Sequence, residues 1–504
     1  MSRIRHWIDG RYAEGTSQRC GEVFDPATGA VSGQVDFAEQ RQVGEAVSAA
    51  ARAYPAWRDT SLATRTRITF AFRELLAARK DDLAALITAE HGKVASDAAG
   101  EVQRALENVE FACGAPQLLK GGYSESVSTG VDVHSTAAPL GVVGVISPFN
   151  FPVMVPLWFV PNAIACGNTV VLKPSEKDPS AANLIAELFA AAGLPDGVLN
   201  VVHGDKVAVD ALLAAPLVRA VSFVGSTPVA RHVYETGTAE GKRVQALGGA
   251  KNHMVVLPDA DLDLAADAAV SAGFGSAGER CMAISVVVAV DPIGDELVRR
   301  ITERMGSLRV GDGRDPASEM GPLITAAHRE RVESYLDTGV GEGAELVVDG
   351  RKRETPGASG GFWLGPSLFD HVRPETSLYD DEIFGPVLSV VRSPSYDAAL
   401  GLINANPYGN GTAVFTTDGG AARRFGKDVE VGMVGVNVPI PVPVASYSFG
   451  GWKDSLFGDS HAYGPEAFHF FTRRKVITSR WPDQSAGVNL AFPANQNSPS
   501  NSGS

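Results

Sequence analysis

Short apolar runs alternate with stretches rich in alanine and leucine from Gly141 onward. The first series of runs, bounded by glycine, proline or asparagine, is Val142–Ile146, 169–172, 199–202 and 221–224. A second series begins near Met254 and includes Ile284–Val290, 387–391, 412–415 and Met433–Val436. Helical stretches such as 181–192 separate the runs, so the pattern predicts an α/β fold with two parallel sheets. The boundary between them is expected near 248–251.

The first part of the chain has the apolar period of amphipathic helices. In the segment from about 98 to 112, apolar residues fall at i, i+3, i+4 and i+7, namely Val102, Ala105, Leu106 and Val109. Arg104 lies on the opposite face of this predicted helix. Asp36 and Glu39 have the spacing of a capping box, which predicts a helix that continues to Ala53. A further helical region is expected from about 64 to 90.

Three segments fit neither series. Residues 123–136 are polar with alternating valine, which is typical of a hairpin arm. Residues 468–481 are strand-like and stand where they can pair with such an arm. From about Ser485 the chain is rich in asparagine, serine, proline and glycine, so we expect disorder there.

The size and charge of the chain narrow its function. A chain of 504 residues is too long for one core, and its length alone suggests about three domains. A formal net charge of -14 without a basic cluster argues against nucleic acid or an anionic membrane as partner. The four cysteines lack C-x-x-C spacing, so neither a disulfide framework nor a metal site is expected. No signal-like segment follows Met1, and the apolar stretch 151–160 is broken by prolines, so we expect a cytoplasmic protein.

Cys281 stands in a glycine-rich segment just before the predicted strand Ile284–Val290. A lone cysteine is usually a buried, unreactive core residue. Gly273, Gly275 and Gly278 argue against a helix here, because glycine destabilises helix interiors. The segment is therefore predicted to be an exposed loop at a site, with Cys281 as a candidate nucleophile.

Polar residues follow the ends of several predicted strands, where open α/β sheets bind ligands. Asn150 is either a turn residue between prolines or, beside a cysteine nucleophile, an oxyanion donor. Lys173 and Glu176 form either an ordinary charged turn or a pair that binds a ribose. Ser226, at the start of a predicted helix, is suited to a pyrophosphate. No G-x-G-x-x-G motif follows these strands, so the pattern alone gives dinucleotide binding only partial support.

Taken together, five motifs resemble the aldehyde dehydrogenase family: the turn around Cys281 and the segments 148–152, 173–176, 223–227 and 382–386. They occur in the family's order and spacing, and the resemblance covers about residues 3 to 482. It implies two Rossmann-like parallel-sheet domains and a β oligomerisation arm. The implied parts are an NAD-binding domain (1–122 and 141–248), a catalytic domain (249–437), the arm (123–140 and 466–482), a connection past the active site (438–465) and a disordered tail (485–504). The arm implies a homotetramer built as a pair of dimers.

The resemblance also implies roles for single residues. Cys281 matches the nucleophile of the family, and Asn150 matches its oxyanion donor. The residues implied to bind NAD are Phe149, Lys173, Glu176, Gly225, Ser226, Glu382 and Phe384. Of these, Lys173 and Glu176 would bind the adenosine ribose, Ser226 the pyrophosphate and Glu382 the nicotinamide ribose, with Phe384 packed near the nicotinamide.

Further motifs resemble a CoA-acylating branch of the family that acts on the semialdehydes of malonate and methylmalonate. They are the segments 100–104, 278–285, 437–443 and 449–459. This resemblance implies CoA as co-substrate and loss of CO2. Arg104 and Arg280 match the two arginines that bind the substrate carboxylate in this branch. Without the resemblance, Arg104 is an ordinary solvated arginine on the polar face of a helix.

Hydrolytic members of the family carry a glutamate in an E-L-G-G-K motif, which activates water. Aligned on Lys251, this chain has Leu247 at that position, and a one-residue gap would place Ala246 there instead. Neither side chain accepts a proton, so we expect CoA rather than water to take the acyl group. CoA-acylating relatives usually carry asparagine, so Leu247 departs from them as well. Two alternatives stay open: a hydrolytic enzyme with another base such as Glu279, and a catalytically silent protein that keeps the fold.

Overall fold

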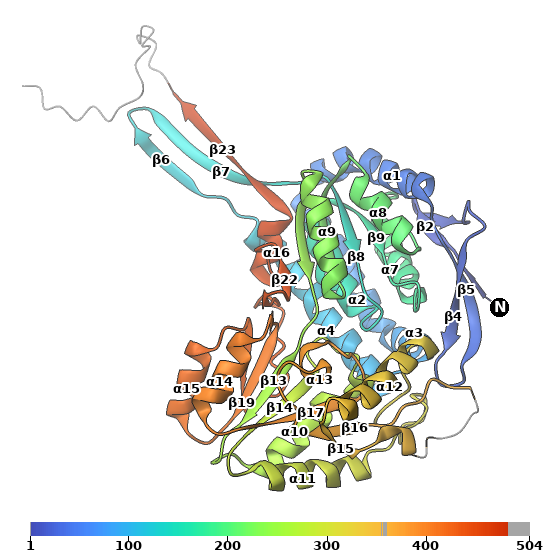
Figure 1. The fold of residues 1–504 in the computed structure, drawn as a ribbon. Helices are drawn as coiled ribbons and strands as arrows, with labels where there is room; N and C mark the ends of the chain where they lie inside the picture. The colour runs from blue at the N-terminus through green and yellow to red at the C-terminus, as the bar shows by residue number, and fades with distance from the viewer. Residues whose placement is uncertain (1, 354, 356–359, 482–504) are drawn as a thin grey trace, which may run out of the picture.

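The computed structural model describes residues 2–353, 355 and 360–481, and its body is built on two large sheets (Figure 1). The first sheet has eight strands in the order β22-β12-β11-β8-β9-β10-β2-β3. Its five central strands are parallel: β8 (Val142–Ile146), β9 (Thr169–Lys173), β10 (Leu199–Val201), β11 (Val218–Val224) and β12 (Arg243–Leu247). Antiparallel strands complete its edges: β2 (His6–Ile8), β3 (Arg11–Ala13) and β22 (Leu456–Phe457). The carboxyl ends of the parallel strands therefore meet at one edge of the sheet.

The second sheet has seven strands in the order β15-β16-β17-β14-β13-β19-β20. Six of them are parallel: β13 (Asn252–Val256), β14 (Ile284–Val290), β16 (Ser367–Asp370), β17 (Val387–Ser393), β19 (Gly411–Phe415) and β20 (Met433–Val436). The edge strand β15 (Glu345–Val348) is antiparallel. The predicted alternation of apolar runs and helices is thus confirmed in both series, because strands buried on both faces are apolar along their whole length.

Helices cover both sheets. Those of the first half are α1 (Gln40–Asp59), α2 (Leu62–Ala78), α3 (Lys80–His91), α4 (Ala95–Cys113), α5 (Ala115–Leu118), α6 (Met154–Ala165), α7 (Ser180–Ala191), α8 (Lys206–Ala214) and α9 (Thr227–Ala239). Those of the second half are α10 (Leu262–Phe274), α11 (Gly294–Ser307), α12 (Ala326–Gly341), α13 (Ser377–Asp380), α14 (Tyr396–Ala405), α15 (Gly419–Asp428) and α16 (Gly464–Phe470). Every residue of α6 is buried, which accounts for the apolar stretch that begins at Phe151. Within the described residues no helix combines the length and the apolar character needed to cross a bilayer.

Three small sheets complete the fold. The arm contains β6 (Tyr123–Ser128), β7 (Val131–Pro139) and β23 (Thr472–Arg480) and extends away from the body (Figure 1). The expected pairing of the late strand with the hairpin is present, because β23 runs antiparallel to β7 along its whole length. The other two sheets are β1 (Ser2–Ile4) with β5 (Ala30–Asp36) and β4 (Cys20–Asp25), and β18 (Tyr408–Gly409) with β21 (Trp452–Lys453).

One prediction about the first helices is wrong, and the helical region predicted from about 64 to 90 is confirmed as two helices rather than one. Asp36 does not open a capping box: it ends strand β5, and its carboxylate accepts hydrogen bonds from Arg3 Nε at 2.8 Å and from the Gly15 N–H. Helix α1 begins at Gln40 instead and makes no side-chain cap bond. The region from 64 to 90 is two helices, because Arg79 leaves the helical conformation and two aspartates in the first turn of α3 suit a new N-terminus.

The late strand is shorter than predicted. Residues 468–470 belong to helix α16, and the strand β23 starts only at Thr472. Phe468 and Phe470 are buried, so their apolar character reflects helix packing rather than a strand. The tail expected from Ser485 lies outside the described residues.

Candidate active site

The predicted nucleophile Cys281 follows a tight buried turn, η1 (Gly275–Gly278), between helix α10 and strand β14. Ser276 and Ala277 have left-handed backbone angles, with φ of 49° and 53°, which L residues rarely adopt. Gly278 has φ +75°, and a Cβ there would lie 2.2 Å from the Gly385 carbonyl oxygen. The turn is therefore specified by local close packing that only glycine permits at this position.

The expectation of an exposed loop around Cys281 is wrong. Gly273 lies in the last turns of α10, and Ser276, Ala277 and Gly278 are buried. Cys281 itself is half-buried. The glycines serve close backbone packing rather than solvent exposure, because the turn is pressed against the segment that carries Gly385.

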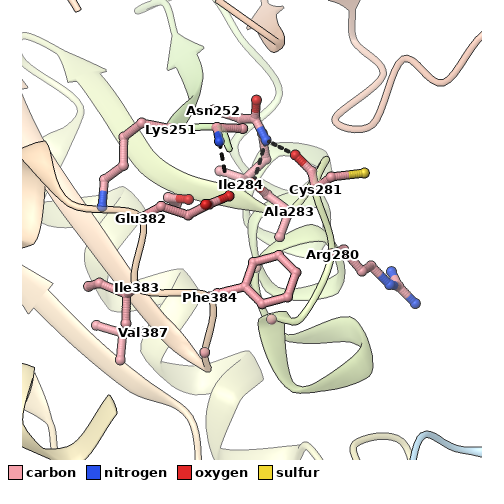
Figure 2. Close-up of a pocket in the computed structure, with 15 residues that line it drawn as sticks. Lys251, Asn252, Arg280, Cys281, Ala283, Ile284, Glu382, Ile383, Phe384 and Val387 are labelled. Carbon is pink, nitrogen blue, oxygen red and sulfur yellow. Dashed lines mark hydrogen bonds between the residues drawn. The ribbon is translucent and has the colours of Figure 1, made fainter. Parts of the chain in front are cut away.

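Two asparagines fix the backbone of the nucleophile. Asn252 Nδ2 donates to the Cys281 carbonyl at 2.9 Å and to the Ala283 carbonyl at 2.9 Å (Figure 2). Asn410 Nδ2 donates to the same Cys281 carbonyl at 3.1 Å. Sequence reasoning missed both residues. The only available signal was that Asn252 adjoins Lys251, on which the base position was aligned.

Burial raises the pKa of the Cys281 thiol to about 12, and the nearby charge of Glu382 acts in the same direction. The backbone N–H groups of the turn and Arg280 oppose this effect only in part. The side chain is therefore a neutral thiol at pH 7 in this state, and it must give up its proton when it attacks an electrophile.

Glu382 and Phe384 line the same pocket as Cys281 and Arg280 (Figure 2). Glu382 Oε1 accepts the Ala250 N–H at 2.9 Å, and burial raises the pKa of this carboxyl to about 7. Phe384 has φ +59°, and its carbonyl is 2.7 Å from His328 Nε2. The predicted cofactor segment and the predicted nucleophile thus lie together.

Phe149 joins this group from the first half of the chain. Its ring meets that of Phe384 edge-on, with centroids 5.8 Å apart. Lys177 Nζ lies over the same ring at 4.4 Å from the centroid. Asn150, the next residue, is buried, and its backbone carbonyl accepts a hydrogen bond from Lys93 Nζ at 2.5 Å.

The residues predicted to bind the adenosine half of NAD lie at the carboxyl ends of β9 and β11. Lys173 ends β9 and forms an ion pair of 3.3 Å with Glu176. Gly225 and Ser226 follow β11, and Ser226 is the N-cap of α9 without using its hydroxyl as a cap. A free hydroxyl at a helix N-terminus fits a pyrophosphate, and a carboxylate beside an ammonium fits ribose hydroxyls. The residues present therefore suit a dinucleotide.

The two predicted carboxylate-binding arginines are already paired within the chain. Arg280 Nη2 lies 2.7 Å from Asp97, and the half-exposed Arg104 lies 3.0 Å from Glu107. Burial raises the pKa of Tyr463, and the charge of Arg104 opposes this effect in part. Tyr463, a buried residue that sequence reasoning missed, donates its hydroxyl to the Pro443 carbonyl at 3.0 Å.

Leu247 ends strand β12 and is buried in the apolar cluster against which Cys281 packs. Glu279, the other candidate base, is fully buried, and its Oε1 accepts the Ile324 N–H at 3.2 Å. Burial raises the pKa of Glu279 to about 8. Among the described residues, Glu279 does not line the pocket that Cys281, Arg280 and Glu382 share, so its position rather than its pKa argues against a role as the base.

Comparison with known proteins agrees with this fold and site. The model of the aldehyde dehydrogenase family matches residues 12–477. The chain belongs to the aldehyde dehydrogenase family.

Individual relatives are more specific. The chain is 55% identical to the malonate-semialdehyde dehydrogenase of Pseudomonas aeruginosa, over 98% of this chain and 100% of that protein. It is similar in structure to methylmalonate-semialdehyde dehydrogenase from Oceanimonas doudoroffii, with a TM-score of 0.94 and 55% identity, over 96% of this chain and 99% of that one. A Sinorhizobium meliloti chain solved in complex with NAD has a TM-score of 0.95 and 50% identity, with coverage of 96% and 99%.

Proposed function

We propose that this aldehyde dehydrogenase oxidises malonate or methylmalonate semialdehyde with NAD through a thioester on Cys281. The acyl group then passes to CoA with loss of CO2, which gives acetyl-CoA or propionyl-CoA. The names of the relatives with 55% identity support the substrate class. The main reason to propose CoA rather than water as the acyl acceptor is the buried Leu247 at the position of the hydrolytic base.

In the first step the Cys281 thiol loses its proton to solvent water, and the resulting thiolate attacks the aldehyde carbon. The oxyanion that forms is stabilised by the side-chain amide of Asn150 and the backbone N–H of Cys281. Bound by the cofactor residues at the ends of β9 and β11 and by Glu382, NAD supplies the hydride acceptor. Departure of the hydride from the tetrahedral carbon leaves the thioester on Cys281.

The substrate carboxylate is bound by Arg104 and Arg280. A guanidinium binds a carboxylate through two parallel hydrogen bonds. In the free protein Arg104 is paired with Glu107 and Arg280 with Asp97, so the substrate carboxylate replaces these two side chains when it binds. In the thioester this carboxylate is beta to the carbonyl. It leaves as CO2, because the electron pair of the broken bond delocalises into the thioester carbonyl, and the carbanion is then protonated.

Acyl transfer completes the cycle. The CoA sulfur attacks the thioester carbonyl and Cys281 leaves as its thiolate. CoA brings a strong sulfur nucleophile, whereas water needs a base to activate it. Leu247 and Ala246 cannot be that base, and the full burial of Glu279 outside the Cys281 pocket disfavours the hydrolytic alternative. The polar site around Cys281, complete in this chain, disfavours a catalytically silent protein.

The remaining assignments belong to the same proposal. The half around the eight-stranded sheet (1–122 and 141–248) binds NAD, and the half around the seven-stranded sheet (249–437) carries the nucleophile. The arm (123–140 and 466–482) joins subunits into a homotetramer. Segment 438–465 connects past the active site. The enzyme works in the cytoplasm on small molecules, without nucleic acid or membrane partners.

A rapid-mixing experiment tests the proposed reaction. Enzyme, NAD and malonate semialdehyde without CoA should release about one NADH per active site quickly and then turn over slowly, because water lacks its base. Addition of CoA should restore steady turnover and give an acyl-CoA, identified by mass spectrometry. Cys281→Ala should show no burst while it still binds NAD. Fast steady turnover without CoA, with a free acid as product, would contradict the CoA-acylating assignment.

A further inference from the structure

One short segment contacts both halves of the candidate active site. It runs from the end of α3 to the first turns of α4, residues 91–101, and we call it the α3–α4 junction. From it, Asp97 contacts the turn that presents Cys281, and Lys93 and Glu101 contact the segment that presents Asn150. None of these three residues contacts the reacting atoms in the proposed reaction, although Asp97 pairs with Arg280 in the free protein.

The two carboxylate oxygens of Asp97 bind different groups of the nucleophile turn. Oδ2 accepts hydrogen bonds from the Ser276 N–H at 3.2 Å and from Ser276 Oγ at 3.0 Å. Oδ1 forms the 2.7 Å ion pair with Arg280. Arg280 Nε in turn donates to Ser276 Oγ at 3.3 Å, which closes a ring of three side chains. Asp97 thus contacts the turn on both sides of its sharpest bend.

The turn needs such a tether because its backbone is strained. Ser276 and Ala277 are consecutive L residues in the left-handed region, a conformation that persists only when the surroundings fix it. The carboxylate of Asp97 binds the N–H and the hydroxyl of the first strained residue, and these charge-assisted bonds are stronger than neutral ones. Loss of the tether would let the turn relax and shift Cys281.

Lys93 and Glu101 hold the oxyanion segment in the same manner. Lys93 Nζ donates to the Asn150 carbonyl and to Glu101 Oε2 at 2.9 Å, and both charged side chains are fully buried. Glu101 Oε1 accepts the N–H groups of Val153 at 2.8 Å and Met154 at 3.1 Å. The buried Lys93–Glu101 pair therefore binds the backbone of the oxyanion segment at Asn150 and at the start of α6.

We propose that the α3–α4 junction is a positioning element that sets the distance between the Cys281 sulfur and the Asn150 amide. Asp97 fixes the nucleophile side and the Lys93–Glu101 pair fixes the oxyanion side. The proposal rests on the roles of Cys281 and Asn150 in the proposed function, but not on the identity of the aldehyde or of the acyl acceptor. Asp97, Lys93 and Glu101 are positioning residues, since they act through the groups that they hold.

The test on the nucleophile side compares Asp97→Ala with Asp97→Asn. Asparagine keeps an oxygen for Ser276 and loses the ion pair with Arg280, whereas alanine loses both. The aldehyde is propanal, which has no carboxylate, so the proposed role of Arg280 in binding a substrate carboxylate does not affect the result.

We expect the NADH burst rate of Asp97→Ala at saturating propanal to fall about 10- to 100-fold, the range expected for a small misplacement of a reacting group. Asp97→Asn and the exposed control Asp81→Ala should stay within about threefold of the wild type, and NAD affinity should be unchanged in all three.

The rate at which iodoacetamide alkylates Cys281 gives a second measurement that needs no aldehyde. Asp97→Ala should change it, because the turn has moved, and Asp97→Asn should not. A burst rate of Asp97→Ala equal to that of the wild type, or an Asp97→Asn variant as slow as Asp97→Ala, would overturn the proposal.

The oxyanion side is tested with the double variant Lys93→Met/Glu101→Gln. Both charges are removed together, because a single substitution would leave a buried charge without its partner. We expect a burst at least about 10-fold slower, since donors aimed at the oxyanion contribute strongly to such steps, with normal alkylation of Cys281. A normal burst in a folded double variant would refute this half of the element. A wild type that oxidises propanal but not the semialdehyde would contradict the proposed function and leave this inference standing.

Discussion

At the scale of single residues, we expect the fate of the proposed thioester to depend on Leu247. It is buried in the apolar cluster against which Cys281 packs, and the alignment on Lys251 places it where hydrolytic family members carry a glutamate base. Leu247→Glu should therefore speed the slow phase of NADH release without CoA. The gain should stay below the roughly 10²- to 10⁴-fold of a well-positioned general base, because no nearby group was selected to orient water.

The same variant should respond to pH in a defined direction. Burial raises the pKa of a carboxyl, so Glu at 247 becomes the charged base only as the pH rises through that pKa, and the acceleration should grow with pH. The matched control is Leu247→Gln, which has a similar size and cannot take a proton. Equal acceleration by Leu247→Gln, measured by stopped-flow absorbance of NADH, would show that solvent entry rather than base catalysis is responsible.

We expect the choice between NAD and NADP to depend on Glu176. Its carboxylate lies 3.3 Å from Lys173 at the end of β9 and would repel a 2′-phosphate on the ribose. We expect kcat/KM to be higher with NAD than with NADP. Glu176→Gln should lower the ratio of the two kcat/KM values, because it removes the repulsion and leaves Lys173 unpaired. Glu240→Gln, an exposed charge at the end of α9, serves as control. A wild type that prefers NADP would contradict the assignment.

The motifs of the candidate site could be recognised in the sequence, but the contacts that hold them in place could not. The motif around Cys281 and the motif of Glu382 and Phe384 are local in sequence, and the structure brings them into one pocket. Asn252 and Asn410, which fix the Cys281 carbonyl, lie 29 and 129 positions away from it in the chain. Contacts over such separations depend on the tertiary fold, and a single asparagine carries no periodic signal for them.

At the scale of elements, the sequence predicts strands better than the segments around them. Strands β8 and β14 have the predicted bounds, because a parallel strand buried on both faces is an unbroken apolar run with sharp polar limits. The edge strand β20 also has its predicted bounds, although Val436 is exposed. The sheet of β1, β4 and β5 was not anticipated, because its strands are half exposed and carry mixed residues. The last three residues of helix α16, 468–470, were assigned to a strand, because clustered phenylalanines suit both states.

The turn at Gly275–Gly278 shows why glycine content alone is ambiguous. Several glycines indicate either an exposed loop or a close backbone approach. Here the second reading holds, since a Cβ at Gly278 would meet the Gly385 carbonyl. Choosing between them requires knowing which segment lies opposite, and Gly385 is more than a hundred residues further along the chain.

At the scale of the whole molecule, the arm is the feature that would be least favourable in a monomer. Its three strands project from the body with exposed apolar side chains, namely Tyr123, Val127, Val476, Ile477 and Trp481. Exposed strand edges and apolar patches are unfavourable in water unless another chain covers them. We therefore expect light scattering at micromolar concentration to give the mass of four chains, as a pair of dimers.

A charge placed on the arm tests whether this surface forms the contact. Val476 is 64% exposed on β23, so Val476→Asp should leave the fold of the subunit intact while it places an unpaired charge in the buried contact, which is costly. The variant should shift the mass toward dimers or monomers and lower the melting temperature, because oligomerisation stabilises the folded chain by mass action. Val207→Asp, at an exposed position of α8 outside the arm, should keep the mass of the wild type. A wild-type protein that is monomeric at micromolar concentration would refute the role of the arm. A wild-type dimer would mean that the arm forms only one of the two kinds of subunit contact that a pair of dimers requires.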